Sequence, residues 1–533
     1  MSAAQHDSST TTERVYLGQW ADAVPEREAL LVGDGEVVLT YAELDARSNQ
    51  VAHAIRALGL EVGDGLAIML DNNETFVELW WGGMRSGTYL TPINWHLTAP
   101  EVEYLLADSQ AKVLVFQERL APVVAKALAA APHIVPLVVG DPGDVPGVPG
   151  VRSYEELVSA QPAARIVPEV AGGIMFYSSG TTGKPKGIRP PLSGGGPDDG
   201  RSLMCYVGQR YGVREGARYL SPGPLYHSAP ITWTTSMHTL GSTSVVMRRF
   251  DAEEALALID HQKITHVQFV PTMFQRIANL PDEVKARYDV SSLEAVWHAA
   301  APCPVHLKRA MIDLFGPVLW EYYAGSEGGG TMISTEEWLE RPGSVGRHWS
   351  GGTIRILDPV TLDEVPTGQA GLIYFEPLAI HRFQYHNDPQ KTSDAYHGEL
   401  FTLGDIGHLD EDGYLYLTDR KSNMIISGGV NIYPQEIEDV LSQHPAIADA
   451  AVFGIPHDEF GEQVMAAVQL HDPSSAGPQM HTEIERYCRE SLAGFKVPRR
   501  LEFFDELPRD ANGKLYKRRL RDRYWEGRDS KII

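Results

Sequence analysis

Residues 172–187, GGIMFYSSGTTGKPKG, limit the fold of this chain more than any other stretch. The apolar residues 174–177 predict a short buried strand. Small polar residues and glycines follow directly, and then Lys184 and Lys186 on either side of Pro185. Glycines let backbone N–H groups converge on an anion, and hydroxyl and ammonium groups add further donors. The pattern therefore predicts a strand that ends in a polyphosphate-binding loop.

The spacing of this loop excludes one common class of nucleotide site. A Walker loop has four residues between its first glycine and its Gly-Lys pair, whereas Gly180 and Gly183 enclose only two. A flexible linker is the structural alternative, but linkers rarely carry paired lysines and a proline directly behind a strand. We therefore predict a phosphate-binding loop that is not a Walker loop.

The length and charge of the chain restrict its organisation and partners. A chain of 533 residues is too long for one ordinary core, so we expect two or more domains. The formal net charge of −24 argues against binding to nucleic acid or to anionic membrane surfaces. An anionic substrate must then be held by local positive groups, which gives Lys184 and Lys186 more weight.

Cysteine usage and the N-terminus indicate the compartment. Cys205, Cys303 and Cys488 are widely spaced and odd in number, which predicts free thiols in a reducing environment. The first 20 residues contain no basic region followed by an apolar run, and no stretch approaches the ~18 apolar residues of a membrane span. We predict a cytoplasmic protein without a membrane span.

Helical and strand patterns alternate through the first part of the chain. Thr40 and Glu43 form a candidate capping box at the start of a helix that runs to about Leu58. This alternation predicts a largely parallel sheet covered by helices. The Pro- and Gly-rich residues 141–150 predict a surface loop. Strand patterns cover residues 63–70, 89–94, 113–116 and 134–139, and a second helical pattern covers residues 73–85.

Further motifs follow the loop in a fixed order. They are GPLYH at residues 223–227, WHAAAP at 297–302, EYYAGSE at 321–327, TLGD at 402–405, Asp419-Arg420 after a predicted hairpin, and PRDANGK at 508–514. Together with the loop, this series resembles the adenylate-forming superfamily, which includes acyl-CoA synthetases, adenylation domains of peptide synthetases and beetle luciferases. The resemblance extends from about Leu39 to Lys514.

The resemblance implies an α/β fold with two domains. The large N-terminal domain, residues 1–420, has layered sheets and helices and binds ATP and the acyl substrate. The small α+β C-terminal domain, residues 421–533, is mobile and carries a catalytic lysine. The family has a charged hinge residue two positions after Arg420, where this chain has Ser422. We therefore expect either a different pivot or a rotation without a charged latch.

The resemblance also implies roles for individual residues. ATP phosphates would bind the signature loop, whose members are Ser178, Ser179, Gly180, Thr181, Thr182, Gly183, Lys184 and Lys186. Adenine, ribose and α-phosphate would contact Ala299, Ala300, Ala301, Tyr323, Ser326, Asp405 and Arg420. Lys514, Glu327, Thr181 and His227 would be catalytic, and Glu327 and Thr181 would also bind Mg²⁺. The acyl group would contact His227, Trp233 and His298, although Trp233 fits a core position equally well. Gly428 and Gly429 would face the incoming thiol.

These roles imply ATP-dependent activation of a small carboxylic acid, with ATP, Mg²⁺ and coenzyme A as partners. The acid forms an acyl-adenylate that passes to coenzyme A, as in fatty acid metabolism. An amine or a separate carrier protein is the alternative acceptor, since only 19 residues follow Lys514 and no fused carrier domain is expected. A non-enzymatic paralogue should have lost its charged residues, whereas Lys514, Glu327, Asp405 and Arg420 are present. A homodimer is a further open expectation.

Overall fold

A computed structural model describes residues 14–178, 185–198, 208, 212–377, 382–420, 423–427, 430–457, 460–509 and 515–526. Their contacts divide the chain into two units. Among the described residues, unit 1 comprises 14–178, those of 185–268, and 283–295. Unit 2 comprises 269–282 and the residues from 296 onward. Of the helices in the described ranges, none has both the length and the apolar character needed to cross a membrane.

Unit 1 contains a six-stranded sheet in which every neighbouring pair is parallel. This confirms the parallel sheet that the alternating sequence pattern predicts. The strand order is β7-β6-β5-β3-β4-β8. The strands are β3 (Gly65–Met69), β4 (Tyr89–Pro92), β5 (Ala111–Gln117), β6 (Val135–Val139), β7 (Arg152–Ser153) and β8 (Gly173–Ile174).

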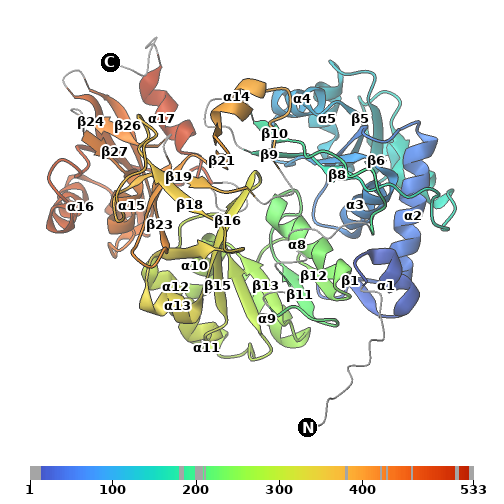
Figure 1. Cartoon of the computed structure of the whole chain (residues 1–533), viewed down its shortest axis with the longest axis horizontal. Helices are drawn as coiled ribbons and strands as arrows, with labels where there is room; N and C mark the ends of the chain where they lie inside the picture. Colours follow the sequence, from blue (N-terminus) through green and yellow to red (C-terminus); the bar gives the residue numbers. More distant parts are fainter. Residues whose placement is uncertain are drawn as a thin grey trace, which may run out of the picture. The chain divides into compact units, whose positions relative to one another are not determined.

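Helices cover both faces of this sheet (Figure 1). Successive residues of a strand point to opposite faces, and β3 follows this rule. Leu66 and Ile68 belong to one hydrophobic cluster, with residues of the helices α2 and α3. Ala67 and Met69 belong to another, with residues of α4 and α5. The covering helices are α2 (Tyr41–Ala57), α3 (Glu74–Ser86), α4 (Ala99–Asp108), α5 (Ala121–Leu128) and α6 (Tyr154–Ser159).

The predicted capping box at the start of α2 is confirmed. The Glu43 backbone N–H donates to Thr40 Oγ1 at 3.2 Å, and the Thr40 backbone N–H donates to the Glu43 carboxylate at 2.8 Å. These bonds satisfy two N–H groups that have no partner within the helix. The first turn of this helix is therefore determined by local sequence.

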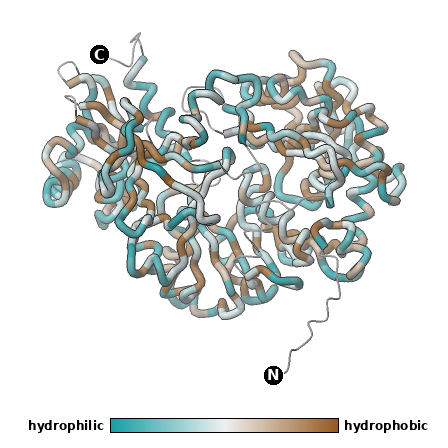
Figure 2. The backbone as a smooth tube through the Cα atoms, viewed as in Figure 1, coloured by the Kyte–Doolittle hydropathy of each residue, from teal (hydrophilic) through white to brown (hydrophobic). Residues whose placement is uncertain are grey.

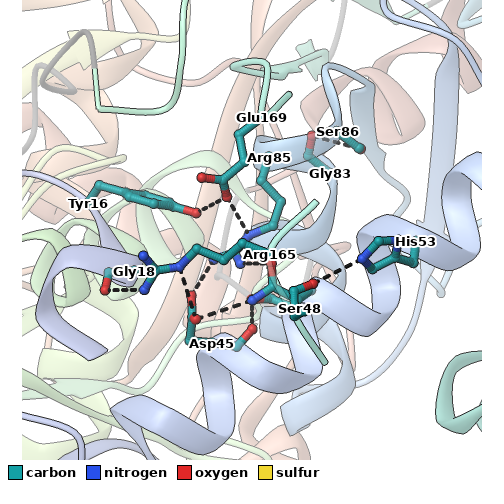
Figure 3. Close-up of polar contacts among 12 residues, drawn as sticks. Tyr16, Gly18, Asp45, Ser48, His53, Gly83, Arg85, Ser86, Arg165 and Glu169 are labelled. Carbon is teal, nitrogen blue, oxygen red and sulfur yellow. Dashed lines mark hydrogen bonds and ion pairs between the residues drawn. The ribbon is translucent and has the colours of Figure 1, made fainter. Parts of the chain in front are cut away.

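A buried ionic network joins helix α1 (Leu17–Ala23) to α2 and α3 (Figure 3). Arg85 on α3 is fully buried and donates to Asp45 of α2 at 2.8 Å. Its Nε lies 3.6 Å from Glu169, which also accepts a hydrogen bond from Tyr16 beside α1. Arg165 donates to the carbonyl of Gly18 at 2.7 Å. Segments far apart in the sequence are thus linked through two guanidinium groups.

Unit 1 also contains five neighbouring strands of a larger sheet, in the order β2-β1-β12-β11-β13. Neighbours among these five are parallel except for the antiparallel pair of β1 and β2. The strands are β1 (Glu28–Val32), β2 (Val37–Thr40), β11 (Arg218–Ser221), β12 (Thr243–Val246) and β13 (His266–Phe269), and the accompanying helices include α8 (Ser228–Thr239) and α9 (Ala252–His261).

In unit 2, parallel strands β14 (Ala295–His298) and β15 (Leu319–Gly325) are followed by antiparallel strands. The sheet continues in the order β16, β17, β23, β22, β19, β21, β20, and β18 pairs with β19. These strands are β16 (Gly328–Ser334), β17 (Ser344–His348), β18 (Ile354–Leu357), β19 (Gly371–Phe375), β20 (Tyr396–His397), β21 (Leu400–Phe401), β22 (Asp405–Leu409) and β23 (Leu415–Arg420). The helices are α10 (Pro271–Ala278), α12 (Val305–Phe315), α13 (Thr335–Glu340) and α14 (Pro389–Asp394).

The C-terminal part of unit 2 has its own sheet and hydrophobic clusters. Strands β26 and β27 are largely hydrophobic, whereas helix α16 is mostly hydrophilic (Figure 2). This α+β composition agrees with the predicted fold class. Its elements are β24 (Ile425–Ser427), β25 (Val430–Ile432), α15 (Pro434–Leu441), β26 (Ile447–His457), β27 (Gly461–Leu470), α16 (Pro478–Ser491), β28 (Arg500–Phe503) and α17 (Lys517–Trp525).

One local expectation needs correction, and the expected surface loop has two buried residues that were not predicted. The single strand predicted at residues 174–177 is divided into β8 and β9 (Phe176–Ser178) around the buried Met175. The loop at residues 141–150 contains a short 3-10 helix, Pro142–Asp144, and buries Val145 and Val148 in the cluster with α4 and α5. A Pro- and Gly-rich pattern therefore did not reveal its two apolar anchors. The domain boundary at residues 420/421 stays a prediction.

Candidate active site

The signature loop connects two paired strands. Strand β9 is antiparallel to β10 (Lys186–Ile188), and Lys186 is opposite Ser178 in their register. This pairing brings the two ends of the loop together, as a compact anion-binding turn requires. Residues 179–184 and the side chain of Ser178 lie outside the described residues, so their contacts with phosphate stay predictions.

Two of the residues predicted to contact the acyl group belong to unit 1. His227 immediately precedes α8, and its ring lies 4.5 Å from that of Tyr226. Trp233 is on α8 and is fully buried, with its ring stacked at 6.4 Å on Tyr219. A fully buried indole is explained by packing alone. A substrate role for Trp233 therefore stays a prediction.

The predicted adenine-binding turn follows β14 directly. Ala300 has a φ of +77°, in the left-handed region that L-residues other than glycine, Asn and Asp rarely adopt. The family resemblance implies glycines at this turn, and the backbone observed here explains that preference. Ala299 is buried, whereas Ala300 is exposed. The turn thus keeps a glycine-like conformation with an alanine side chain.

A tight hairpin presents Glu327. Strands β15 and β16 are antiparallel, with Gly325 opposite Gly328, so Ser326 and Glu327 form the connecting turn. The Tyr385 hydroxyl donates to Glu327 Oε1 at 3.0 Å. Burial, and then the charge of Glu327, raise the pKa of Tyr385. The phenol therefore stays protonated and remains a donor.

Tyr323 and Asp405 are brought together by a direct hydrogen bond. The Tyr323 hydroxyl donates to Asp405 Oδ2 at 2.5 Å, although the residues are 82 positions apart. Asp405 begins β22 and is opposite Arg420 of β23 in the strand register. The tyrosine predicted to stack on adenine thus contacts the carboxylate predicted to bind ribose. Two of the predicted nucleotide-binding residues of unit 2 are therefore in direct contact.

A buried ion pair lies beside His298. Lys308 Nζ on α12 is 2.6 Å from Glu321 Oε2 on β15, and His298 Nε2 is 3.7 Å from the same oxygen. His298 and Lys308 are fully buried. Burial, and secondly Lys308, hold the pKa of His298 well below its ordinary value. Burial raises the pKa of Glu321, against the effect of Lys308.

Sequence reasoning missed three residues of these arrangements: Tyr385, Lys308 and Glu321. The sequence does indicate that Lys308 is buried, because this lysine shares a helical face with Met311 and Phe315 at i, i+3 and i+7. A lysine on an apolar helix face needs a buried partner. Tyr385 had no such signal, since its contact with Glu327 spans 58 positions.

The remaining predicted site residues are outside the described part of the chain. They are Ser179, Gly180, Thr181, Thr182, Gly183, Lys184, Gly428, Gly429 and Lys514, the hinge position Ser422, and the side chains of Ser178 and Arg420. Their roles stay predictions.

The ligands that the described residues offer are suited to a Mg²⁺ ion that binds together with a nucleotide. No group of three or more His, Cys, Asp or Glu side chains within the described ranges is arranged to hold a metal. Mg²⁺ commonly uses only one or two carboxylates, with water and substrate phosphates as its other ligands. Glu327, a part-buried carboxylate on a hairpin turn, suits that donor set.

Comparison with known proteins agrees with this geometry. The AMP-binding enzyme model matches residues 17–378, and the AMP-binding enzyme C-terminal domain model matches residues 436–514. A long-chain-fatty-acid–CoA ligase, FadD13 of Mycobacterium tuberculosis, is 31% identical over 518 residues, covering 95% of this chain and 97% of the relative. A fatty acid–[acyl-carrier-protein] ligase, ScoC of Streptomyces coeruleorubidus, is 32% identical over 502 residues, covering 91% and 92%.

A solved structure extends this likeness to the fold. The amide bond synthetase McbA from Marinactinospora thermotolerans has a TM-score of 0.78 and 25% identity, with coverage of 96% of this chain and 99% of that one. The family model of the large domain alone spans well over half of the sequence. The chain therefore belongs to the AMP-binding enzyme family of adenylate-forming enzymes.

Proposed function

We propose that this protein is an AMP-forming acyl-CoA ligase, which activates a carboxylic acid with ATP and transfers it to coenzyme A. The observation that carries the proposal is the cluster of Tyr323, Asp405 and Glu327 in unit 2. It combines an aromatic ring, a carboxylate at the start of β22 and a carboxylate on a hairpin turn. An adenine, a ribose and a cation-bound phosphate need these three kinds of group.

In the first half-reaction, an oxygen of the substrate carboxylate attacks the α-phosphorus of ATP. The bond from this phosphorus to the bridging oxygen breaks, and pyrophosphate leaves with its electron pair. The acid is already ionised at neutral pH, so this step needs no general base. When bound, Mg²⁺ would neutralise phosphate charge. The signature loop and Lys514 would stabilise the charge that develops on the phosphate oxygens.

In the second half-reaction, the sulfur of coenzyme A attacks the acyl carbonyl of the mixed anhydride. A thioester forms, AMP leaves with the electron pair of the broken C–O bond, and the thiol proton passes to solvent. By family resemblance, the C-terminal domain, residues 421–533, would rotate between the two steps. Gly428 and Gly429 would then face the thiol, and Lys514 would withdraw.

Relatives of this chain differ in the acceptor of the acyl group. FadD13 supports coenzyme A, whereas ScoC supports a carrier protein and McbA supports an amine. Coenzyme A is our choice because the curated relatives with long coverage include several CoA ligases. The aromatic side chains near His227 favour a bulky or aromatic acid. A cytoplasmic location and a homodimer stay predictions.

The test is pyrophosphate release across a panel of carboxylic acids, with and without coenzyme A. The proposal predicts acid-dependent pyrophosphate release, and an acyl-CoA product when the thiol is present. Adenylate formation without thioester formation, followed by loading of an amine or carrier protein, would identify the alternative acceptor. Absence of pyrophosphate release with every acid would contradict the proposal.

Lys514→Ala should distinguish the two half-reactions. Loss of one preorganised donor to the transition state typically lowers the rate by about 10²–10³-fold. We expect this loss in adenylate formation, whereas thioester formation from a supplied acyl-adenylate should change little. Single-turnover measurement of each half-reaction checks this, and equal losses in both would assign Lys514 a structural role.

A further inference from the structure

The ion pair of Lys308 and Glu321 is buried where stability alone does not explain it. Lys308 is completely shielded from solvent, and Glu321 is 7% exposed. Their 2.6 Å contact is supplemented by the Trp338 ring, 4.7 Å from the Lys308 ammonium group. Removing two charges from water is expensive, and apolar residues often give equal or greater stability at such positions. We therefore expect a buried ion pair of this kind to have a role other than stabilising the fold.

His298 supplies a second, independent anomaly. Its ring is fully buried, and neither ring nitrogen has a hydrogen-bond partner among the described residues. The nearest aromatic contact is Phe274, with ring centroids 5.2 Å apart. Buried polar atoms are nearly always satisfied, so one without a partner often marks a ligand contact. The missing partner is expected to come from outside the chain.

The place of His298 in the fold agrees with a ligand contact. It is the last residue of β14, and β14 is parallel to β15. Ligands of α/β proteins bind beyond the carboxyl ends of parallel strands. In the register His298 is opposite Glu321, two residues before Tyr323, the residue predicted to stack on adenine. His298 is thus one strand away from the predicted nucleotide site.

Glu321 determines which nitrogen of His298 carries the proton. The ring is neutral at neutral pH because burial and Lys308 disfavour the imidazolium. Nε2 is 3.7 Å from the Glu321 carboxylate, which attracts an N–H and repels a lone pair. The proton is therefore on Nε2, and Nδ1 presents a lone pair that accepts hydrogen bonds. Lys308 fixes the carboxylate that makes this selection.

We propose that His298 selects acids whose acyl group carries a hydroxyl or amino hydrogen-bond donor, with Lys308 and Glu321 as positioning residues. The inference rests on the proposed function and gives its acyl site a substrate class. A donor that reaches the buried Nδ1 exchanges its bond to water for one to Nδ1, whereas an acid without a donor loses water and leaves this acceptor unsatisfied. An acid with only an acceptor at that position would face the lone pair of Nδ1.

The test compares matched acids that differ in one substituent. The acids come from three series, based on benzoate, cinnamate and hexanoate. Each series contains hydroxy, amino, methoxy, fluoro and unsubstituted members. Their comparison separates the effect of a hydrogen-bond donor from the effects of an acceptor and of size. For each acid we would measure kcat/KM for pyrophosphate release, and equilibrium binding without ATP by calorimetry. The inference predicts that at least one donor position is preferred over its methoxy and unsubstituted analogues by about 10- to 100-fold.

Variants assign this preference to His298. His298→Leu should reduce the donor preference, measured as the ratio of kcat/KM for the donor acid to kcat/KM for its unsubstituted analogue, to near unity. His298→Asn, which restores a side-chain acceptor, should recover part of the preference. Phe274→Leu is the matched control, because it changes packing against the same ring and leaves Nδ1 intact, so the preference should persist.

The positioning role is tested with a double variant. Single changes of Lys308 or Glu321 leave an uncompensated buried charge and can prevent folding, whereas Lys308→Met with Glu321→Leu removes both charges. This variant should weaken the donor preference and leave use of unsubstituted acids nearly unchanged. A wild-type enzyme that releases pyrophosphate without preferring any donor, or a preference that persists in His298→Leu, overturns the inference. Absence of pyrophosphate release with all acids contradicts the proposed function instead.

Discussion

The two carboxylate oxygens of Glu327 have different surroundings. Oε1 accepts the hydrogen bond from Tyr385, whereas Oε2 lies close to Gly325, where an added Cβ would approach it to 2.8 Å. Fixing one oxygen orients the other, as partners of metal-binding groups generally do. Tyr385 is 8% exposed, and its ring packs edge-to-face against Phe383, with ring centroids 5.2 Å apart, which restricts the position of the hydroxyl. At the scale of single residues, this phenol is a candidate to set metal affinity.

We predict that Tyr385→Phe raises the Mg²⁺ concentration needed for half-maximal ATP binding by about tenfold, a typical effect of losing such a partner. Calorimetric titration of ATP at graded Mg²⁺ concentrations checks this, together with the Mg²⁺ dependence of pyrophosphate release. Tyr396→Phe is the matched control, because its hydroxyl donates to the Phe383 carbonyl at 3.1 Å. Equal Mg²⁺ titrations for the two variants would contradict the role of Tyr385.

At the scale of elements, the turn after β14 stores backbone strain. Ala300 adopts a φ of +77°, whereas Ala301 next to it is not among the residues with positive φ. A left-handed residue with a Cβ costs about 1–2 kcal/mol, which glycine does not incur. At a position with an ordinary φ, replacing alanine by glycine instead lowers the free energy of unfolding, because glycine gives the unfolded chain more conformational freedom. The two neighbouring alanines should therefore respond in opposite directions.

We predict that Ala300→Gly raises the free energy of unfolding by several tenths of a kcal/mol and up to about 1 kcal/mol, whereas Ala301→Gly lowers it by about 0.5–1 kcal/mol. Urea denaturation of both variants and the wild type measures the difference. Opposite signs confirm that backbone conformation, and not side-chain contact, determines the effect. Destabilisation by both substitutions would show that the methyl group of Ala300 makes a contact that outweighs the strain.

The elements of this chain were predictable where local chemistry determines them. The capping box of Thr40 and Glu43 needs residues only three positions apart, and the hairpin of β22 and β23 needs only its Asp412-Gly413 turn. The break at Met175 was not predictable, because an apolar run does not show where strand pairing changes.

The same limit applies to the candidate site. Motif order placed Tyr323, Glu327 and Asp405 in one site, and their sequence segments do converge. The contacts made by Tyr385 and Lys308 depend on tertiary packing across 58 and 13 positions. Sequence periodicity carries no information on such pairs beyond the apolar face on which Lys308 lies.

At the scale of the whole molecule, buried neutral histidines link stability to pH. His238 is fully buried, with its ring fixed by two hydrogen bonds. Trp81 donates to Nδ1 at 3.1 Å, and Nε2 donates to the Ala29 carbonyl at 3.0 Å. Burial lowers the pKa of His238 to about 4. Burial also lowers the pKa of His266 to about 4 and that of His298 well below its ordinary value.

The sign of the resulting pH dependence follows from these directions. Between pH 6.5, the ordinary histidine value, and about 4, the unfolded chain binds protons that folded His238 does not. Its contribution to stability is complete above pH 6.5 and is lost as the pH falls to about 4. The lowered pKa of His238 alone corresponds to at most about 3 kcal/mol. Both units contain such a histidine, so acid should destabilise both.

We predict that the urea midpoint falls between pH 7.5 and pH 4.5, and that His238→Gln makes this fall shallower. Glutamine keeps a donor and an acceptor for Ala29 and Trp81 but cannot bind the proton, so the slope of unfolding free energy against pH should decrease by up to one proton equivalent. His261→Gln, at the exposed end of α9, is the matched control for replacing a histidine by glutamine. The change in slope caused by His238→Gln is compared with the change caused by this control. A slope that His238→Gln leaves equal to that of the wild type would mean that this histidine binds protons as readily in the folded protein as in the unfolded chain.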